Sequence, residues 1–189
     1  MSEILTIDTS KDDDQPNEIH PLKVFDDTIL KKNYIVPDVP EFDNVIVNLA
    51  KRLRMTLKLY GALGIAAPQC GLNARIFVMS VGENFITCVN PKILAKSEHS
   101  VREKEMCLSY LGLTLTIDRP EWIDVEYYDE TGKRYEVRFA GLTSRIFQHE
   151  LDHLNGVRMV DHVGPATMMM ANKKRMKRLK QYEREARGH

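Results

Sequence analysis

The sequence predicts an α+β protein in which antiparallel or mixed sheets of short strands pack around a central helix. Apolar residues recur at helical spacing in three segments, residues 43–60, 142–154 and 165–185. Between the first two, short runs rich in Val, Ile, Tyr, Phe and Thr alternate with turn residues. The length suits one domain, so we expect residues 1–189 to form a single domain.

The composition argues against several classes of protein. Lys plus Arg and Asp plus Glu both number 27, which gives no reason to propose DNA or an acidic substrate as a partner. No apolar run approaches the roughly 20 residues of a membrane span, and the start lacks the features of a signal peptide. The three cysteines include no Cys-x-x-Cys pair. We therefore expect a cytoplasmic protein that does not bind membranes.

The chain begins with a polar segment, residues 1–19. Prolines then predict an irregular stretch over residues 20–40, with one turn of helix at residues 26–32. An amphipathic helix should follow to residue 60, capped by Asp43 and ended by Gly61. Its expected apolar side consists of Val45, Leu49, Leu53, Leu57 and Tyr60.

Residues 61–71 are mostly small and too unevenly patterned for a helix or a strand. Small side chains allow either a ligand or another backbone to approach closely, and the pattern leaves both alternatives open. Neither Lys-Ser nor Lys-Thr follows the glycines, so this segment is not a phosphate loop.

The middle of the chain predicts β-structure. The expected strands are residues 74–80, 85–90, 113–117, 123–128 and 135–139. The expected turns are residues 82–84, 90–91, 119–120 and 130–133. Residues 127–137 carry the most complete hairpin pattern.

A His-Glu-x-x-His motif is formed by His149, Glu150 and His153. Positions four apart lie on one face of a helix, so both imidazoles can reach one metal ion while Glu150 projects nearby. A chance match in a chain of this length is on the order of one percent, so the motif needs support from other residues. We expect the central helix of the fold to be this metal-binding helix.

Flanking residues favour a helix at this motif. Thr143 or Ser144 can cap its start, and Gly156 can end it. Its apolar stripe is expected to consist of Leu142, Ile146 and Leu154.

Residues 164–189 predict a basic C-terminal helix that begins at Pro165. Its expected apolar side consists of Met168, Met169, Met176 and Leu179. Its basic cluster consists of Lys173, Lys174, Arg175, Lys177, Arg178 and Lys180. Such a cluster is either a solvated face or a contact site for RNA or another anionic surface.

A catalytic metal site commonly has three protein ligands and an open position for water, so the two histidines need a partner. His162 follows His153 by nine residues, whereas the extended zinc protease motifs place a third histidine after six. Cys107 is the better candidate. A thiolate with two imidazoles suits iron(II), zinc, nickel or cobalt and excludes magnesium and calcium.

Three blocks together resemble the peptide deformylase family, and they occur in the family's order. They are Gly64-Ile65-Ala66-Ala67-Pro68-Gln69, Glu105-Met106-Cys107-Leu108-Ser109 and Gln148-His149-Glu150-Leu151-Asp152-His153-Leu154. The resemblance extends over most of residues 20–160. Two positions depart from it, because Ala62 and Met106 stand where the family has glycine, and Met106 adds a long side chain next to the metal.

The resemblance implies an enzyme that removes the formyl group from the N-terminal formylmethionine of new polypeptides and releases formate. It implies that Cys107 and the two histidines of the motif bind the metal, usually iron(II) in this family, and that Glu150 is the general acid and base. It also implies that the Gln69 amide and the Leu108 N–H stabilise the oxyanion. Each role has a physical basis, since a metal activates water, a carboxylate transfers protons and neutral donors stabilise developing charge.

Substrate contacts follow from position in the sequence. We expect Leu63, Leu142 and Ile146 to line an apolar pocket for the methionine side chain, and Gly64 to lie beside the peptide, which would pair as an added strand. The basic helix resembles the tail by which some deformylases bind the ribosome.

Two other functions are compatible with the motif. A zinc endopeptidase would leave Gln69 and Cys107 unexplained. A protein without enzymatic activity would have a structural metal or none. A structural metal would need a fourth protein ligand, and a vestigial site would be expected to have lost Glu150, which is present.

Overall fold

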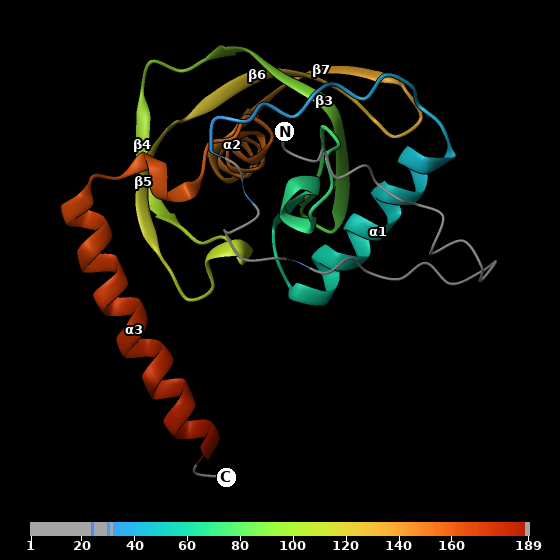
Figure 1. Ribbon diagram of the computed structural model, residues 1–189. Coiled ribbons are helices and arrows are strands. Elements are labelled where there is room, and N and C mark those ends of the chain that lie inside the picture. Colours follow the sequence, from blue (N-terminus) through green and yellow to red (C-terminus); the bar gives the residue numbers. More distant parts are fainter. Residues whose placement is uncertain (1–23, 25–29, 31, 188–189) are drawn as a thin grey trace, which may run out of the picture.

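The computed structural model describes residues 24, 30 and 32–187 (Figure 1). The polar segment predicted at residues 1–19, and most of the turn of helix predicted at residues 26–32, lie outside the described residues. The described chain contains helices and two antiparallel sheets, so the predicted α+β class is confirmed.

The larger sheet has five strands in the order β1-β2-β3-β6-β7, with each neighbouring pair antiparallel. Its strands are β1 (Gly64–Ala66), β2 (Ile76–Val81), β3 (Asn84–Lys96), β6 (Trp122–Tyr128) and β7 (Arg134–Ala140). The smaller sheet pairs β4 (Ser100–Glu105) with β5 (Leu115–Pro120). The predicted hairpin at residues 127–137 is confirmed, since Tyr127 pairs with Tyr135 and Val125 with Val137.

Helix α1 (Asn44–Tyr60) follows the prediction closely. The Asp43 carboxylate accepts hydrogen bonds from the first-turn N–H groups of Val45 and Ile46, and Gly61 ends the helix in the left-handed conformation (φ 60°). The predicted apolar side was wrong at its two ends. Val45 and Tyr60 are exposed, and Ile46 is buried instead, because the side that packs on β1 and β2 is rotated by about one residue.

The strand boundaries needed three corrections. Part of the run of small residues is the strand β1, which pairs with β2. The predicted turns at residues 90–91 and 119–120 lie inside β3 and β5; Asn90 has φ 51° where the register of β3 shifts, so a bulge replaces the turn. Strand β4 was missed because its sequence is almost entirely polar. A two-stranded sheet with one solvent-exposed face can have such a sequence.

Helix α2 (Gly141–Leu154) carries the His-Glu-x-x-His motif and lies between the two sheets, seen nearly end-on in Figure 1. It begins at Gly141, two to three residues before the predicted caps, and no side chain caps it. The helix ends at Leu154 with Asn155 as its C-cap, and Gly156 follows with φ 67°. Phe147 packs edge-to-face on Phe77 of β2, with ring centroids 5.1 Å apart, which anchors the helix to the sheet.

Helix α3 (Pro165–Arg187) contacts the body as far as Leu179, and its C-terminal end projects away from it (Figure 1). Met168 and Leu179 are half-buried as predicted, but Met169 and Met176 are exposed. The predicted apolar side was therefore too wide, because only a narrow stripe of this helix contacts the body. Within the described residues, none of the helices is long and apolar enough to span a membrane.

Candidate active site

The structure brings the three predicted metal ligands together. One ligand atom from each of Cys107, His149 and His153 lies within 4.8 Å of the other two, and all three residues are buried. The histidines occupy successive turns of α2, and Cys107 follows the end of β4. A prediction that depended on residues 42 positions apart in the sequence (149 − 107) therefore agrees with the fold.

The donor set fits a metal ion in distance and in charge. The Cys107 Sγ lies 3.4 Å from the His153 Nε2, close to the roughly 3.6 Å expected between sulfur and nitrogen ligands of a tetrahedral zinc-like ion. Burial by itself would lower the pKa of His149, but Cys107 and Glu105 raise it to about 10. Burial and the His149 charge lower the pKa of His153. The cluster thus favours one positive charge at its centre, which a bound cation would supply.

Glu105 organises the histidine side of the site. Its Oε2 lies 3.0 Å from the His149 Nδ1, so a Nδ1–H donor leaves the other ring nitrogen directed at the metal position. Arg119 donates two hydrogen bonds to this carboxylate, at 2.6 and 2.9 Å, and Arg145 donates a third at 2.6 Å. Burial alone would raise the pKa of Glu105, but hydrogen bonds with His149 and Arg119 hold it far below its usual range.

The network continues along α2. Arg119 also donates to Asp152 at 2.8 Å, and the His162 Nε2 lies 2.7 Å from the same carboxylate oxygen. His162 therefore contacts Asp152 and is not one of the three candidate ligands. The second histidine of the motif, His153, has no such hydrogen bond. Its Nδ1 is buried without a hydrogen-bond partner among the described residues.

Glu150 is buried at the edge of the ligand cluster. Its Oε2 has no hydrogen-bond partner among the described residues, and burial raises its pKa to about 7. A Cβ added at Gly64 would collide with the Oε1 of this carboxylate, so only glycine leaves room for it there. A buried carboxylate with one unpartnered oxygen and a pKa near neutrality can accept and return a proton.

The amide group of Gln69 points toward Cys107. Its Oε1 accepts a hydrogen bond from the Ala66 N–H at 2.9 Å, which fixes the orientation of the amide. Its Nε2 then lies 3.4 Å from the Cys107 Sγ and 3.3 Å from the Ser109 Oγ. Leu108 directly follows Cys107 in a short 3₁₀ turn, Leu108–Tyr110, which places its backbone next to the ligand.

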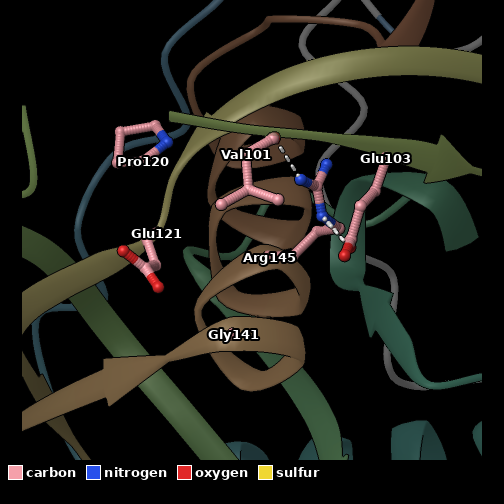
Figure 2. A pocket seen from close by; sticks show the side chains of 6 residues that line it. All are labelled: Val101, Glu103, Pro120, Glu121, Gly141 and Arg145. Atoms are coloured by element: carbon pink, nitrogen blue, oxygen red, sulfur yellow. Dashed lines mark hydrogen bonds and ion pairs between the residues drawn. The ribbon is translucent and has the colours of Figure 1, made fainter. Parts of the chain in front are cut away.

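The residues predicted to line the methionine pocket have different environments. Leu63 and Leu142 are exposed, whereas Ile146 is buried. None of them lines the cavity of about 180 Å³ at the start of α2. Figure 2 shows that cavity, with Arg145 directed toward Glu103 and the Val101 carbonyl; its lining residues are Val101, Glu103, Pro120, Glu121, Gly141 and Arg145.

The two positions that depart from the family pattern are accommodated. Ala62 has an ordinary backbone conformation, since positive φ among the described non-glycine residues occurs only at Asn33 and Asn90. Met106 is 74 % exposed, because Glu105 and Cys107 on either side of it both point inward. Its side chain therefore extends into solvent.

The roles of Arg119 and Arg145 were not predicted from the sequence. Arg119 was assigned to a turn, whereas it lies in β5 with 4 % exposure. A usable signal was present: Leu115, Ile117 and Arg119 alternate with polar residues, which places the arginine on the inward face of a strand. A buried arginine requires a buried anion, and Glu105 is that anion.

Comparison with known proteins agrees with this geometry. Residues 19–168 match the model of the polypeptide deformylase family. The chain belongs to this family. The peptide deformylase of Thermotoga maritima is 36 % identical over 155 residues, which cover 82 % of this chain and 93 % of that protein. The peptide deformylase of a Picosynechococcus species is 35 % identical over 164 residues, covering 84 % and 85 %.

Solved deformylase structures share the fold. The crystal structure from Legionella pneumophila superposes with a TM-score of 0.77 at 31 % identity, covering 87 % of this chain and 98 % of that one. The crystal structure from Synechococcus elongatus, a complex with actinonin, also gives 0.77 at 31 % identity, covering 82 % and 86 %. This chain is therefore an enzyme of the deformylase family.

Proposed function

We propose that residues 1–189 form one catalytic domain that removes the N-formyl group from the N-terminal formylmethionine of nascent polypeptides. Water adds to the formyl carbon, the carbon–nitrogen bond breaks, and formate and a free amine leave. The observation that carries this proposal is the convergence of the Cys107 sulfur and two imidazoles beside an unpartnered, buried carboxylate oxygen.

Cys107, His149 and His153 would hold one divalent transition metal, natively iron(II), with zinc, nickel or cobalt as substitutes. The proposal is supported by the soft thiolate, which disfavours magnesium and calcium. When bound, the metal supplies a Lewis acid that makes water a nucleophile at neutral pH. Glu105 keeps the His149 ring oriented for this task.

Glu150 acts as the general base and then the general acid. Its free oxygen takes the proton from the attacking water and returns it to the leaving amine, and a pKa near 7 suits both transfers. The Gln69 amide and the Leu108 N–H stabilise the negative oxygen that develops on the formyl carbon. Neutral donors held in place before the reaction need little reorganisation in the transition state.

The peptide would bind along β1, which stands at the edge of the five-stranded sheet. An added strand there passes Gly64, whose missing side chain leaves Glu150 accessible to the formyl group. Leu63, Leu142 and Ile146 then contact the methionine side chain. Recognition of backbone groups beyond the first residue implies little preference for the following sequence.

Formate release from formyl-Met-Ala-Ser, measured under anaerobic conditions with iron or nickel supplied, tests this function. Glu150→Gln should keep its metal and lose most turnover, whereas Cys107→Ala should lose the metal as well. Retained turnover in Glu150→Gln would remove this residue from the mechanism. Internal cleavage of casein without formate release would favour an endopeptidase.

The basic side of α3 supports a second part of the proposal, binding to the ribosome in the cytoplasm. Four lysines are exposed on this helix: Lys173, Lys174, Lys177 and Lys180. Replacing all four by alanine should reduce co-sedimentation with ribosomes and leave turnover of formyl-Met-Ala-Ser unchanged. Unchanged co-sedimentation would contradict this part alone.

A further inference from the structure

The first turns of α3 complete the apolar cluster in which Cys107 is buried. The buried members of this cluster are Leu30, Cys107, Tyr110, Leu113, Leu115, Ile117 and Met159. Met168 and Ala171 of α3 pack against it. The thiolate side of the active site is therefore covered partly by a helix that contributes no ligand.

The middle of α3 holds the turn that follows Cys107. The Arg175 Nε donates a hydrogen bond of 2.7 Å to the Leu111 carbonyl, and Arg178 donates one of 3.2 Å to the Thr114 hydroxyl. Gly112, with φ 73°, lies under the helix, since a Cβ added there would meet Leu179 at 3.6 Å. Side chains from two turns of α3 thus contact both ends of residues 111–114, through two solvent-exposed hydrogen bonds.

Backbone hydrogen bonds link this turn to Cys107. The Tyr110 N–H donates to the Cys107 carbonyl at 3.0 Å, and the Leu113 N–H donates to the Tyr110 carbonyl at 2.9 Å. Consecutive tight turns therefore connect Cys107 to the carbonyl that Arg175 holds. Leu111 therefore lies four residues after Cys107, along a backbone held by these two hydrogen bonds.

We propose that Arg175 is a positioning residue of the active site, acting with Arg178 and Leu179 to hold residues 111–114 and, through them, Cys107 and Leu108. The proposal rests on the metal-dependent function proposed above. It divides the predicted basic cluster into two groups. Arg175 and Arg178 hold the active-site turn, and the four exposed lysines remain available to an anionic partner.

The test compares Arg175→Ala with Lys174→Ala, which removes one positive charge from an exposed position of the same helix. Each full-length variant is loaded with cobalt(II). Arg175→Ala should shift or weaken the sulfur-to-cobalt absorption band and release cobalt to a chelator about tenfold faster. Turnover of formyl-Met-Ala-Ser should fall roughly tenfold in kcat with KM changed less than twofold. Lys174→Ala should match the wild type in all three measurements.

Arg175→Lys should recover part of the loss, because an ammonium group can donate to the same carbonyl. If Arg175→Ala folds, by circular dichroism, and matches Lys174→Ala in absorption, cobalt release and kcat, the proposal is wrong. If it does not fold, Thr114→Val removes one anchor without altering α3. This variant should show a smaller shift in the same direction, and wild-type behaviour would overturn the proposal.

The positioning role and the proposed function can fail separately. Absence of formate release from the wild type would contradict deformylation, while the cobalt absorption and release rates would still test Arg175.

Discussion

The two sides of the active site are held by different physical means. On the histidine side, Glu105 is the centre of a buried ionic network that joins His149, Arg119 and Arg145. On the cysteine side, Cys107 lies in an apolar cluster covered by α3. The first arrangement fixes direction through hydrogen bonds, and the second fixes position through packing.

This difference determines how each side should respond to amino-acid substitution. Removing one member of a buried ionic network leaves other charges buried and unpaired, so the loss is large and abrupt. An apolar cluster loses stability in proportion to the volume removed and can relax around the defect. The histidine side should therefore be intolerant of substitution, and the cysteine side should be more adaptable.

The largest effect is expected at Glu105. Glu105→Ala removes the carboxylate that Arg119 and Arg145 share, while both arginines stay buried. The free energy of unfolding, measured by urea denaturation, should therefore fall by about 3–5 kcal/mol. It should also weaken metal binding roughly 10- to 100-fold, because His149 loses its partner. The control is Glu103→Gln, an exposed partner of Arg145 that should cost less than about 1 kcal/mol. Equal costs for the two variants would contradict the network.

A core truncation on the cysteine side should cost less. Leu115→Ala removes a side chain that is 1 % exposed, and the resulting cavity should lower the free energy of unfolding by about 3 kcal/mol. Metal binding should weaken less than in Glu105→Ala, because the histidine anchors remain. Leu111→Ala, at a position 70 % exposed, should change stability by less than about 0.5 kcal/mol. Complete loss of metal in Leu115→Ala would show that the cluster is as intolerant as the network.

Gly64→Ala tests the point where β1 meets Glu150. The added methyl group must displace the carboxylate, so kcat/KM for formyl-Met-Ala-Ser should fall roughly 10- to 100-fold, with a stability cost of about 1–3 kcal/mol. Gly164→Ala is the control, because its added Cβ meets no heavy atom within 4 Å among the described residues. Wild-type kcat/KM in Gly64→Ala would place the working position of Glu150 elsewhere.

The smallest effect is expected at Asp161, which pairs with Arg158 and Lys32 near the surface. Burial by itself would raise the pKa of Asp161, but hydrogen bonds from Arg158 and Lys32 lower it to about 2. Because the folded-state pKa lies below the unfolded value of about 4, this stabilisation is present above pH 4 and is lost as the pH falls toward 2. Asp161→Asn should therefore cost less than about 1 kcal/mol at neutral pH. The difference in free energy of unfolding between Asp161→Asn and the wild type, measured in urea, should shrink as the pH falls from about 4 to 2. A constant difference would contradict this interpretation.

The parts of the site that follow local rules could be predicted from sequence. The i, i+4 spacing of His149 and His153 requires only a helix, and the caps Asp43 and Gly61 require only local hydrogen bonds and a left-handed residue. Cys107 could be assigned because three sequence blocks together identify a family whose ligands are known by position. In these cases the determining interactions are close in sequence or carried by a motif.

The parts of the site that depend on burial could not be predicted. Strand β4 was missed because a run of polar residues usually signals a solvated segment. Arg119 was placed in a turn although it alternates with Leu115 and Ile117, because its buried partner Glu105 is brought to it only by the fold. Met169 and Met176 of α3 were misassigned for the same reason, since which stripe of a helix contacts the body depends on the turn against which it packs.

The sequence by itself therefore determined the fold class, the helix that carries the motif and the identity of the candidate ligands. Only the tertiary structure decided which charges neutralise one another and which helix faces are covered. The physical reason is that local backbone preferences are encoded within a few neighbouring residues, whereas the desolvation of a charge depends on every segment that surrounds it.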